Sequence, residues 1–346
     1  MLPIAVDTAG SDLGISALVE GAVAAKKEAN ADSLLIGPEQ EILRVLEGLG
    51  AKALNLAICD AQEVITMEDS PARAVRSKQN SSLVKSFQQV VTGQAAAVIS
   101  AGNSGAMMTA GVLHAGLLPA IERPAIASVV PIARNQERYT VVLDVGANVG
   151  CNAHHLVQFG IMGSVYYRSL FNVEQPRVAL LSNGAEASKG TDVIRAAAHT
   201  FKTLKSVNYI GYVEGRDFGT DAADVVVCDG FVGNVILKTL EGCVQMVAEE
   251  LKHGASQSLR HKFGFWLSRD LFTELFRGKF DYRSAGGAPL LGLKELAIVL
   301  HGSSNQRAVK HAILKTREFV DTKMTEKIEI ELAKFEENGL GLSHKE

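Results

Sequence analysis

Cysteine and proline are scarce in this chain of 346 residues, which holds four cysteines and eight prolines. No two cysteines form a CxxC pair, so their spacing predicts neither a zinc ribbon nor a dithiol redox site. Scattered thiols in a chain this long are typical of a reduced, cytoplasmic protein. The sequence has no stretch of 18 uncharged apolar residues and no basic, apolar leader, so we expect neither a membrane span nor a signal peptide.

An excess of charge is also missing: 35 Lys and Arg residues stand against 38 Asp and Glu residues, which gives a formal net charge of −3. General nucleic-acid-binding proteins usually carry a strong basic excess, so we expect no nucleic-acid partner. With 47% hydrophobic residues, the chain has enough apolar material for a large core, which argues against disorder.

Common catalytic and binding motifs are absent as well. The sequence has no GxGxxG for a standard dinucleotide site, no GxxxxGK[ST] for a P-loop NTPase and no GxSxG for the common α/β-hydrolase. It has no HxxxxD and no HExxH, and the adjacent His154 and His155 would not share a helix face. We therefore expect no cofactor and no metal site.

Five short apolar runs each end in a turn rich in Gly, Asn or Asp, at 4–7, 97–100, 141–144, 178–181 and 225–228; a sixth run lies at 33–37. Continuous apolar runs fit strands covered on both faces. Their alternation with helix-like stretches predicts an α/β fold with a doubly wound, mostly parallel sheet. Ligands bind such sheets at the carboxyl ends of the strands, where all five turns are expected. A glycine there can simply permit a tight turn, but five such turns together favour a site.

The turns carry groups suited to an anion and no obvious protein nucleophile. Backbone N–H groups at helix starts favour phosphate, and asparagine side chains add amide hydrogens. These asparagines are Asn103, Asn148, Asn183 and Asn234, and Lys189 after the fourth run adds a cation. A second basic cluster also suits an anion, although a solvated helix face explains each charge equally well; its members are Arg73, Arg76 and Lys78.

The segment 255–282 differs in character, since it holds five of the 13 phenylalanines and the only tryptophan. Its apolar residues spread beyond one helical stripe, which is excessive for an ordinary surface helix. One interpretation is a helical hairpin buried in a dimer. The other is an amphipathic helical tip that dips into a membrane while Lys and Arg meet anionic headgroups. Both can hold at once, and the expected tip residues are Phe263, Trp266, Phe272 and Phe276.

Seven stretches make the sequence familiar: SAGNSGA (100–106), LDVGANV (143–149), LVQFGIMGSV (156–165), NYIGYVE (208–214), CDGFVGN (228–234), LKTLEG (237–242) and HGSS (301–304). In this order, and over nearly the whole chain, they resemble the PlsX family, the phosphate acyltransferases of bacterial phospholipid synthesis. Any one stretch alone would be weak, but together they are highly specific.

The resemblance implies a fold and a reaction. The fold would be a single α/β/α unit over 1–346, like that of phosphotransacetylases and isocitrate/isopropylmalate dehydrogenases, with the helical tip at 255–282 within it. In the reaction, a fatty acyl group would pass from acyl carrier protein to inorganic phosphate, giving acyl phosphate.

The resemblance also implies partners. The protein would be a cytoplasmic homodimer that associates peripherally with the membrane surface through the tip. Its product would go to a membrane acyltransferase that acylates glycerol 3-phosphate.

The implied chemistry fits the residue inventory. Phosphate is itself the nucleophile, so the enzyme needs only to hold a dianion near the thioester carbonyl and to stabilise the oxyanion. We expect Lys189 and Asn234 close to the phosphate, with Asn103 and Asn148 along the same cleft. Further candidates for binding the substrate or phosphate are Gly10, Asp12, Ser104, Gly146 and Gly233.

Two further residues have open roles. Asp229 either orients Lys189 or positions its loop. His155 is a weaker candidate for protonating the departing thiolate, with a packing or capping histidine as the alternative. A thiol of ordinary pKa needs little acid help, so the reaction need not use a general acid.

Three positions depart from the family pattern: Ser11 and Gly150 replace a Gly and an Asp, and Val232 replaces a Thr. The lost polar groups leave open a catalytically degenerate scaffold that binds acyl carrier protein or the membrane. A second alternative, a short-chain phosphotransacetylase that uses acyl-CoA, shares the expected fold.

Overall fold

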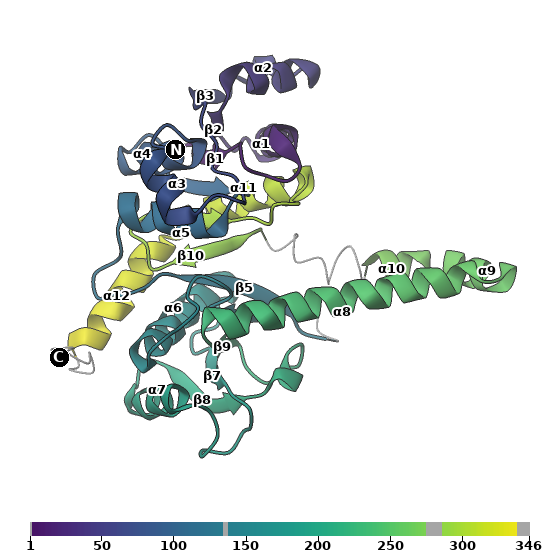
Figure 1. Ribbon diagram of the computed structural model, residues 1–346. Helices are drawn as coiled ribbons and strands as arrows, with labels where there is room; N and C mark the ends of the chain where they lie inside the picture. The colour runs from purple at the N-terminus through teal and green to yellow at the C-terminus, as the bar shows by residue number, and fades with distance from the viewer. Residues whose placement is uncertain (1, 134–137, 275–285, 338–346) are drawn as a thin grey trace.

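The computed structural model describes residues 2–133, 138–274 and 286–337 (Figure 1). Within these residues, eleven strands form one sheet in the order β3-β2-β1-β4-β11-β10-β5-β6-β9-β7-β8. They are β1 (Ile4–Asp7), β2 (Ser33–Gly37), β3 (Ala57–Asp60), β4 (Ala97–Ser100), β5 (Ala125–Pro131), β6 (Tyr139–Leu143), β7 (Arg177–Leu181), β8 (Asn208–Val213), β9 (Val225–Val227), β10 (Ala288–Leu291) and β11 (Ala297–Val299). A strand forms at each of the six predicted apolar runs, and the mostly parallel α/β sheet is confirmed.

Three antiparallel junctions at the centre of the sheet leave five of its eleven strands running opposite to the other six. β11 pairs antiparallel with β10, β10 with β5, and β5 with β6, while the strands on either side pair in parallel. Because there are three such reversals, the strands on one side of the centre run opposite to those on the other side. Strands β1 and β4 therefore run opposite to β6, β7 and β9. All five turns follow the carboxyl ends of their strands, as expected, but these ends do not lie at one edge of the sheet: the turns after β1 and β4 lie at one carboxyl edge, and those after β6, β7 and β9 lie at the opposite one.

Helices cover both faces of the sheet, as its fully buried strands require. One face packs against α1 (Gly14–Ala29), α2 (Glu39–Gly48), α6 (Ala153–Phe171), α7 (Asp192–Thr203), α11 (Gln306–Asp321) and α12 (Met324–Glu337). The other face packs against α3 (Pro71–Ser77), α4 (Ser82–Val91), α5 (Ser104–Ala110) and the first turns of α8 (Gly230–Ser256). A π-helical turn, Gly111–Ala115, extends α5, and short 3₁₀ turns lie at Lys52–Leu54 and Gly215–Asp217.

Side chains in the predicted turns start several of the helices. The Oδ1 atom of Asn103 accepts a hydrogen bond from the backbone N–H of Ala106 at 3.1 Å, which caps α5. Asp229 caps α8 in the same way, through the N–H of Val232 at 2.9 Å. Because such caps satisfy otherwise free N–H groups of the first helical turn, they fix where each helix begins.

Helix α8 leaves the body of the protein as an arm (Figure 1). It has 27 residues, about 40 Å at 1.5 Å per residue, yet Gly230 and Gly233 are its only buried residues. At its far end it contacts α9 (Leu259–Leu267), which is followed by α10 (Arg269–Glu274). The described part of the expected tip, 255–274, therefore lies at the end of this arm, and Phe276 lies outside the described residues.

The sequence predicted no membrane span, but α8 is long and apolar enough to cross a membrane by length and composition, with a window of mean hydropathy 1.2. Its first turns nevertheless carry the charged Lys238 and Glu241 and pack against the sheet through Ile236, Leu237 and Leu240. In this fold α8 is thus an arm anchored at one end.

Candidate active site

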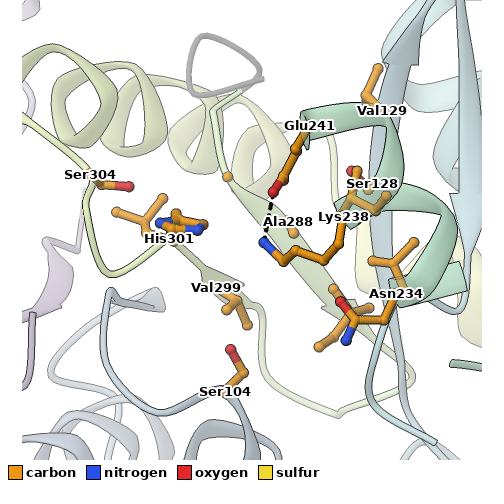
Figure 2. A pocket seen from close by; sticks show the side chains of 15 residues that line it. Ser104, Ser128, Val129, Asn234, Lys238, Glu241, Ala288, Val299, His301 and Ser304 are labelled. Atoms are coloured by element: carbon orange, nitrogen blue, oxygen red, sulfur yellow. Dashed lines mark hydrogen bonds and ion pairs between the residues drawn. The ribbon is translucent and has the colours of Figure 1, made fainter. Parts of the chain in front are cut away.

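A pocket lies over the central strands, between the start of α5 and the first turns of α8 (Figure 2). Strands β5, β10 and β11 supply mainly apolar lining residues, and the loop after β11 lines the side opposite α8. Both carboxyl edges contribute to it, because Ser104 follows β4 and Asn234 follows β9. Its polar lining residues are Ser104, Ser128, Asn234, Lys238, Glu241, His301 and Ser304.

One face of α8 supplies three of these polar residues. Asn234, Lys238 and Glu241 are spaced by four and three residues, which places them on one side of a helix. The Nζ atom of Lys238 lies 2.8 Å from Oε2 of Glu241 (Figure 2). The side chain of Lys238 is 52% exposed, so this ion pair holds an ammonium group at the solvent-facing wall of the pocket, where an anion can share it.

Gly146 lies next to Asn234. A Cβ atom added to Gly146 would stand 3.7 Å from Cγ of Asn234, an ordinary contact. The φ angle of Gly146 is +138°, which L side chains rarely adopt, so the backbone conformation and not the space requires glycine here.

The loop after β11 faces α8 across the pocket with His301 and Ser304 (Figure 2). Nδ1 of His301 accepts a hydrogen bond from the backbone N–H of Ser303 at 3.2 Å, which fixes the ring relative to its own loop. The pocket therefore combines a cation on one side with imidazole and hydroxyl groups on the other.

The turn after β6 is built around the fully buried carboxylate of Asp144. Oδ1 accepts hydrogen bonds from the backbone N–H groups of Ile126, Gly146 and Ala147 at 3.0–3.2 Å. Oδ2 accepts from both the N–H and the side-chain amide of Asn148, at 2.7 and 2.9 Å. Burial raises the pKa of Asp144 against the opposing effect of these donors. Asp144 was not among the predicted site residues, and it shapes the turn that carries two of them.

Asn148 and Asn103 use their amide hydrogens within the protein. Asn148 donates to the carbonyl of Pro124 at 2.7 Å as well as to Asp144, and its side chain is buried. Asn103 donates to the carbonyls of Thr66, Met67 and Asp69 at 3.2–3.4 Å. In this arrangement both amides shape the turns, and neither side chain lines the pocket, unlike Asn234.

Gly233 serves a close approach between α8 and the β6 turn. A Cβ atom on Gly233 would stand 1.9 Å from the carbonyl oxygen of Asp144, so only glycine fits. This contact sets how closely the start of α8 approaches the β6 turn. It thereby sets the position of Asn234, the next residue.

The loop after β1, with Gly10 and Asp12, packs on the loop after β11. The N–H of Asp12 donates to the carbonyl of Gly302 at 3.0 Å, and the hydroxyl of Ser11 donates to the same oxygen at 3.0 Å. Gly10 has φ +83°, whereas Ser11 has an ordinary backbone conformation. The serine that departs from the family pattern therefore joins two loops without strain.

The other two departures lie at open positions. No described atom lies within 4 Å of where a Cβ on Gly150 would stand. The side chain of Val232 is 37% exposed, and its backbone N–H already serves the cap of α8.

Lys189 lies apart from the pocket lining. It sits in the exposed loop after β7, where its N–H donates to the carbonyl of Glu186 at 2.9 Å. Among the described residues it forms no ion pair with Asp229, whose carboxylate caps α8 instead. The structure thus brings Asn234, Ser104 and the β6 turn together and leaves Lys189 on a neighbouring loop of the same carboxyl edge.

His155 is a capping histidine. Its Nδ1 accepts from the N–H of Asn152 at 3.1 Å, so its proton lies on Nε2, which is 2.7 Å from Oε2 of Glu122. Burial, followed by the nearby Arg123, lowers the pKa of His155, so the ring is neutral and both nitrogens are engaged. This geometry matches the capping alternative.

Two thiols near the site are not thiolates at neutral pH. Burial, reinforced by Asp144 and Asp229, raises the pKa of the Cys228 thiol well above its usual range. Burial also raises the pKa of Cys151 to about 12. Because the thiolate is the nucleophile, neither cysteine is activated for attack.

Five residues that line the pocket were not predicted from the sequence: Lys238, Glu241, His301, Ser304 and Ser128. A signal for the first two was present, since both follow Asn234 at helical spacing. His301 and Ser304 belong to a stretch that contributed to the family resemblance without a chemical role. Ser128 lies inside a strand, where the sequence gives no sign of a ligand.

The fold is that of phosphotransacylases. A phosphotransacetylase from Streptococcus pyogenes matches it with a TM-score of 0.62 at 16% identity, over 92% of this chain and 94% of that one. A branched-chain phosphotransacylase from Enterococcus faecalis V583 matches with a TM-score of 0.56 at 14% identity, over 92% and 99% of the two chains. The expected α/β/α architecture is confirmed.

The chain belongs to the phosphate acyltransferase family and is an acyltransferase. Residues 2–327 match the family described as fatty acid synthesis protein. The chain is 46% identical over 330 residues to the phosphate acyltransferase of Geotalea uraniireducens, which covers 94% of each chain. It is 42% identical over 340 residues to that of Pelotomaculum thermopropionicum, 98% of each chain. The family resemblance stated from the motifs is therefore confirmed.

Proposed function

We propose that this enzyme transfers a fatty acyl group from acyl carrier protein to inorganic phosphate and so supplies acyl phosphate for phospholipid synthesis. Two facts support the proposal. Relatives that match nearly the whole chain are named phosphate acyltransferases. The pocket also combines a cation suited to phosphate with apolar walls suited to an acyl chain, formed by Ile126, Val129, Val145, Leu237, Val299 and Leu300.

The observation that carries the proposal is the position of Lys238. Among the described residues that line the pocket, Lys238 is the one with an ammonium or guanidinium group, and its Nζ lies 2.8 Å from Oε2 of Glu241. A phosphate dianion that binds here gains a charge-assisted hydrogen bond from this ammonium group.

In the proposed reaction, an oxygen of hydrogen phosphate attacks the thioester carbonyl carbon. The new C–O bond forms, the C–S bond breaks, and the proton of the hydrogen phosphate ends on the departing thiolate, so the products are acyl phosphate and thiol. Lys238 holds the attacking anion, and the amide of Asn234 donates to the oxyanion that develops on the carbonyl oxygen. The chain need not supply a nucleophile, in keeping with the protonated thiols of Cys151 and Cys228.

Lys189 retains a proposed role as a second cation near the phosphate. Its loop follows β7, and β7 and β9 are neighbours in the sheet, so it borders the edge from which α8 and Asn234 arise. Asp12 and Gly10 have a proposed indirect role. The backbone N–H of Asp12 donates to the carbonyl of Gly302, so the loop with Gly10 and Asp12 helps to hold the loop that carries His301.

The arm carries the proposed membrane and dimer contacts. Phe263 and Trp266 are 61% and 64% exposed and stack on each other, whereas Phe272 is half-buried against Phe265. We assign the first two to a lipid surface, beside Arg260, Lys262 and Arg269.

The exposed apolar side chains along α8 itself suit a second copy of the chain; they are Phe231, Val235, Met246, Val247 and Leu251. In this proposal the enzyme is a cytoplasmic homodimer that releases acyl phosphate at the membrane, to a glycerol-3-phosphate acyltransferase there.

The test is phosphate-dependent loss of acyl groups from palmitoyl–acyl carrier protein, with hydroxylamine to trap acyl phosphate. The proposal expects hydroxamate only when phosphate is present. Faster turnover of acetyl-CoA than of the palmitoyl substrate would instead identify a short-chain phosphotransacetylase. Binding of the carrier protein without any turnover would identify a degenerate scaffold.

A further inference from the structure

We infer that α3 is a docking surface for an acidic carrier protein, with Arg73 and Arg76 as its contact residues. The inference rests on the proposed function, because it assumes that the acyl donor is a protein. It starts from the basic cluster that the sequence showed at 73–78, which the pocket does not use.

The structure separates the members of this cluster. Lys78 is internal to the fold: its Nζ lies 2.6 Å from Oδ2 of Asp69 and donates to the carbonyl of Val64 at 2.9 Å. Arg73 and Arg76 are exposed, and among the described residues no ion pair or hydrogen bond engages either guanidinium group. Other arginines do find partners, as Arg138 and Arg177 both do with Asp221 and Asp224.

The two arginines share one face of α3. They are three residues apart, so their side chains are neighbours on the helix surface. Together with Ser70, Ala72 and Ser77 they line a shallow hollow, while Ala74 and Val75 turn into the core. This face of α3 is thus open and carries two positive charges.

The position of α3 connects this face to the pocket. Helix α3 packs on α5, and the two helices come close at Pro71 and Gly105. A Cβ atom added to Gly105 would stand 2.8 Å from Cγ of Pro71. Asn103 ties the loop before α3 to the start of α5 through the carbonyls of Thr66, Met67 and Asp69. Since Ser104, the next residue, lines the pocket, α3 stands at the border of the site.

Charge complementarity identifies the partner. Guanidinium groups match carboxylates in a two-pronged geometry, so exposed neighbouring arginines favour an acidic helix. A protein that delivers a thioester must bring its acyl group to the pocket. Helix α3 borders that pocket, whereas the basic residues at the far end of the arm, around α9, lie away from α3 and α5 (Figure 1). The chain itself has a net charge of −3, so a local basic face is needed to orient an acidic partner.

The experiment compares R73E/R76E with K202E/K205E in the full-length protein. The control pair changes the net charge equally and has the same spacing in sequence; both positions are exposed, with Lys202 in the last turn of α7 and Lys205 just after the helix. Binding of palmitoyl–acyl carrier protein is measured without phosphate, and initial rates are measured with phosphate. A neutral variant, R73Q/R76Q, keeps the test valid if charge reversal lowers folded yield.

We expect R73E/R76E to weaken binding and to raise KM for the carrier protein about tenfold or more, with KM for phosphate unchanged. R73Q/R76Q should show a smaller effect and the control none. Three outcomes would each overturn the inference. R73E/R76E could bind the carrier protein as well as the unsubstituted protein does, the unsubstituted protein could fail to bind it, or R73E/R76E could lose only its binding to vesicles. Arginine-dependent binding without phosphate-dependent turnover would support the docking surface while it refutes the proposed reaction.

Discussion

Gly233 lies directly against the carbonyl oxygen of Asp144, where a Cβ atom would approach to 1.9 Å. The contact joins the start of α8 to the turn after β6. Both partners come from the same carboxyl edge, and Asn234 follows Gly233 in the chain. The close approach of α8 to the turn after β6 therefore determines the position of Asn234 in the pocket.

Gly233→Ala should destabilise the protein and disturb the site. The added methyl group meets backbone rather than a flexible side chain, so α8 must shift; overpacking of this kind costs about 1–3 kcal/mol. We expect a lower free energy of unfolding in urea and a kcat reduced about tenfold or more. Gly48→Ala is the control, because no described atom outside its own helix turn lies within 4 Å of the added Cβ. Equal stability of the two variants would contradict the packing account.

The buried carboxylate of Asp7 should give stability a measurable pH dependence. Burial raises the pKa of Asp7 from 3.8 to about 6, against hydrogen bonds from Ser82, Ser100 and Ala9. The folded state then binds more protons than the unfolded state between these values, so this group's contribution to stability falls as pH rises through that window, by about 3 kcal/mol.

Asp7→Asn removes this titration. The free energy of unfolding of the unsubstituted protein minus that of the variant should decrease between about pH 4 and pH 6. Asp270→Asn, an exposed carboxylate on the arm, is the control and should leave the profile parallel. A difference that is flat with pH for Asp7→Asn would show that Asp7 titrates normally.

His155 should matter for stability more than for turnover. His155→Ala removes the capping contact with Asn152 and should lower stability by about 1 kcal/mol, whereas His155→Gln keeps a capping-box side chain and should lower it less. Neither should change kcat by more than about twofold. A hundredfold loss of kcat in a fully folded His155→Gln would restore the histidine as a proton donor.

The exposed tip residues should control vesicle binding. Replacing Phe263 and Trp266 by serine removes the most exposed rings of the described arm and should release the protein from anionic vesicles in a sedimentation assay. Val91→Ser with Ile330→Ser removes comparably exposed apolar groups elsewhere and should have no effect. Loss of the dimer with retained vesicle binding would favour the buried hairpin instead.

The sequence predicted the local elements better than their mutual placement. Continuous apolar runs identified β1 and β4 because strands covered on both faces need no alternation. The reversal of five of the eleven strands arises from pairings of β5 with β10, more than 150 residues apart, for which no local pattern exists.

In the candidate site, too, the sequence predicted which residues follow the strands but not which of them line the pocket. Asn234, which was expected in a site at the end of β9, lines the pocket, because the residues that start α8 follow the strand directly. Asn103 and Asn148 have the same side chain after similar strands, yet backbone carbonyls occupy their amides. Lys238 escaped notice because a Lys and a Glu three residues apart are common on any exposed helix.

The phosphate dependence of the Lys238→Ala variant tests the central claim most directly. Loss of a charge-assisted hydrogen bond of about 1.5–3 kcal/mol should raise KM for phosphate about 10- to 100-fold, with folding unchanged and KM for palmitoyl–acyl carrier protein little affected. Lys202→Ala serves as the surface control, and Lys189→Ala measured alongside reports on the second cation. A KM for phosphate that is normal in Lys238→Ala and raised only in Lys189→Ala would contradict the assignment of this pocket as the phosphate site.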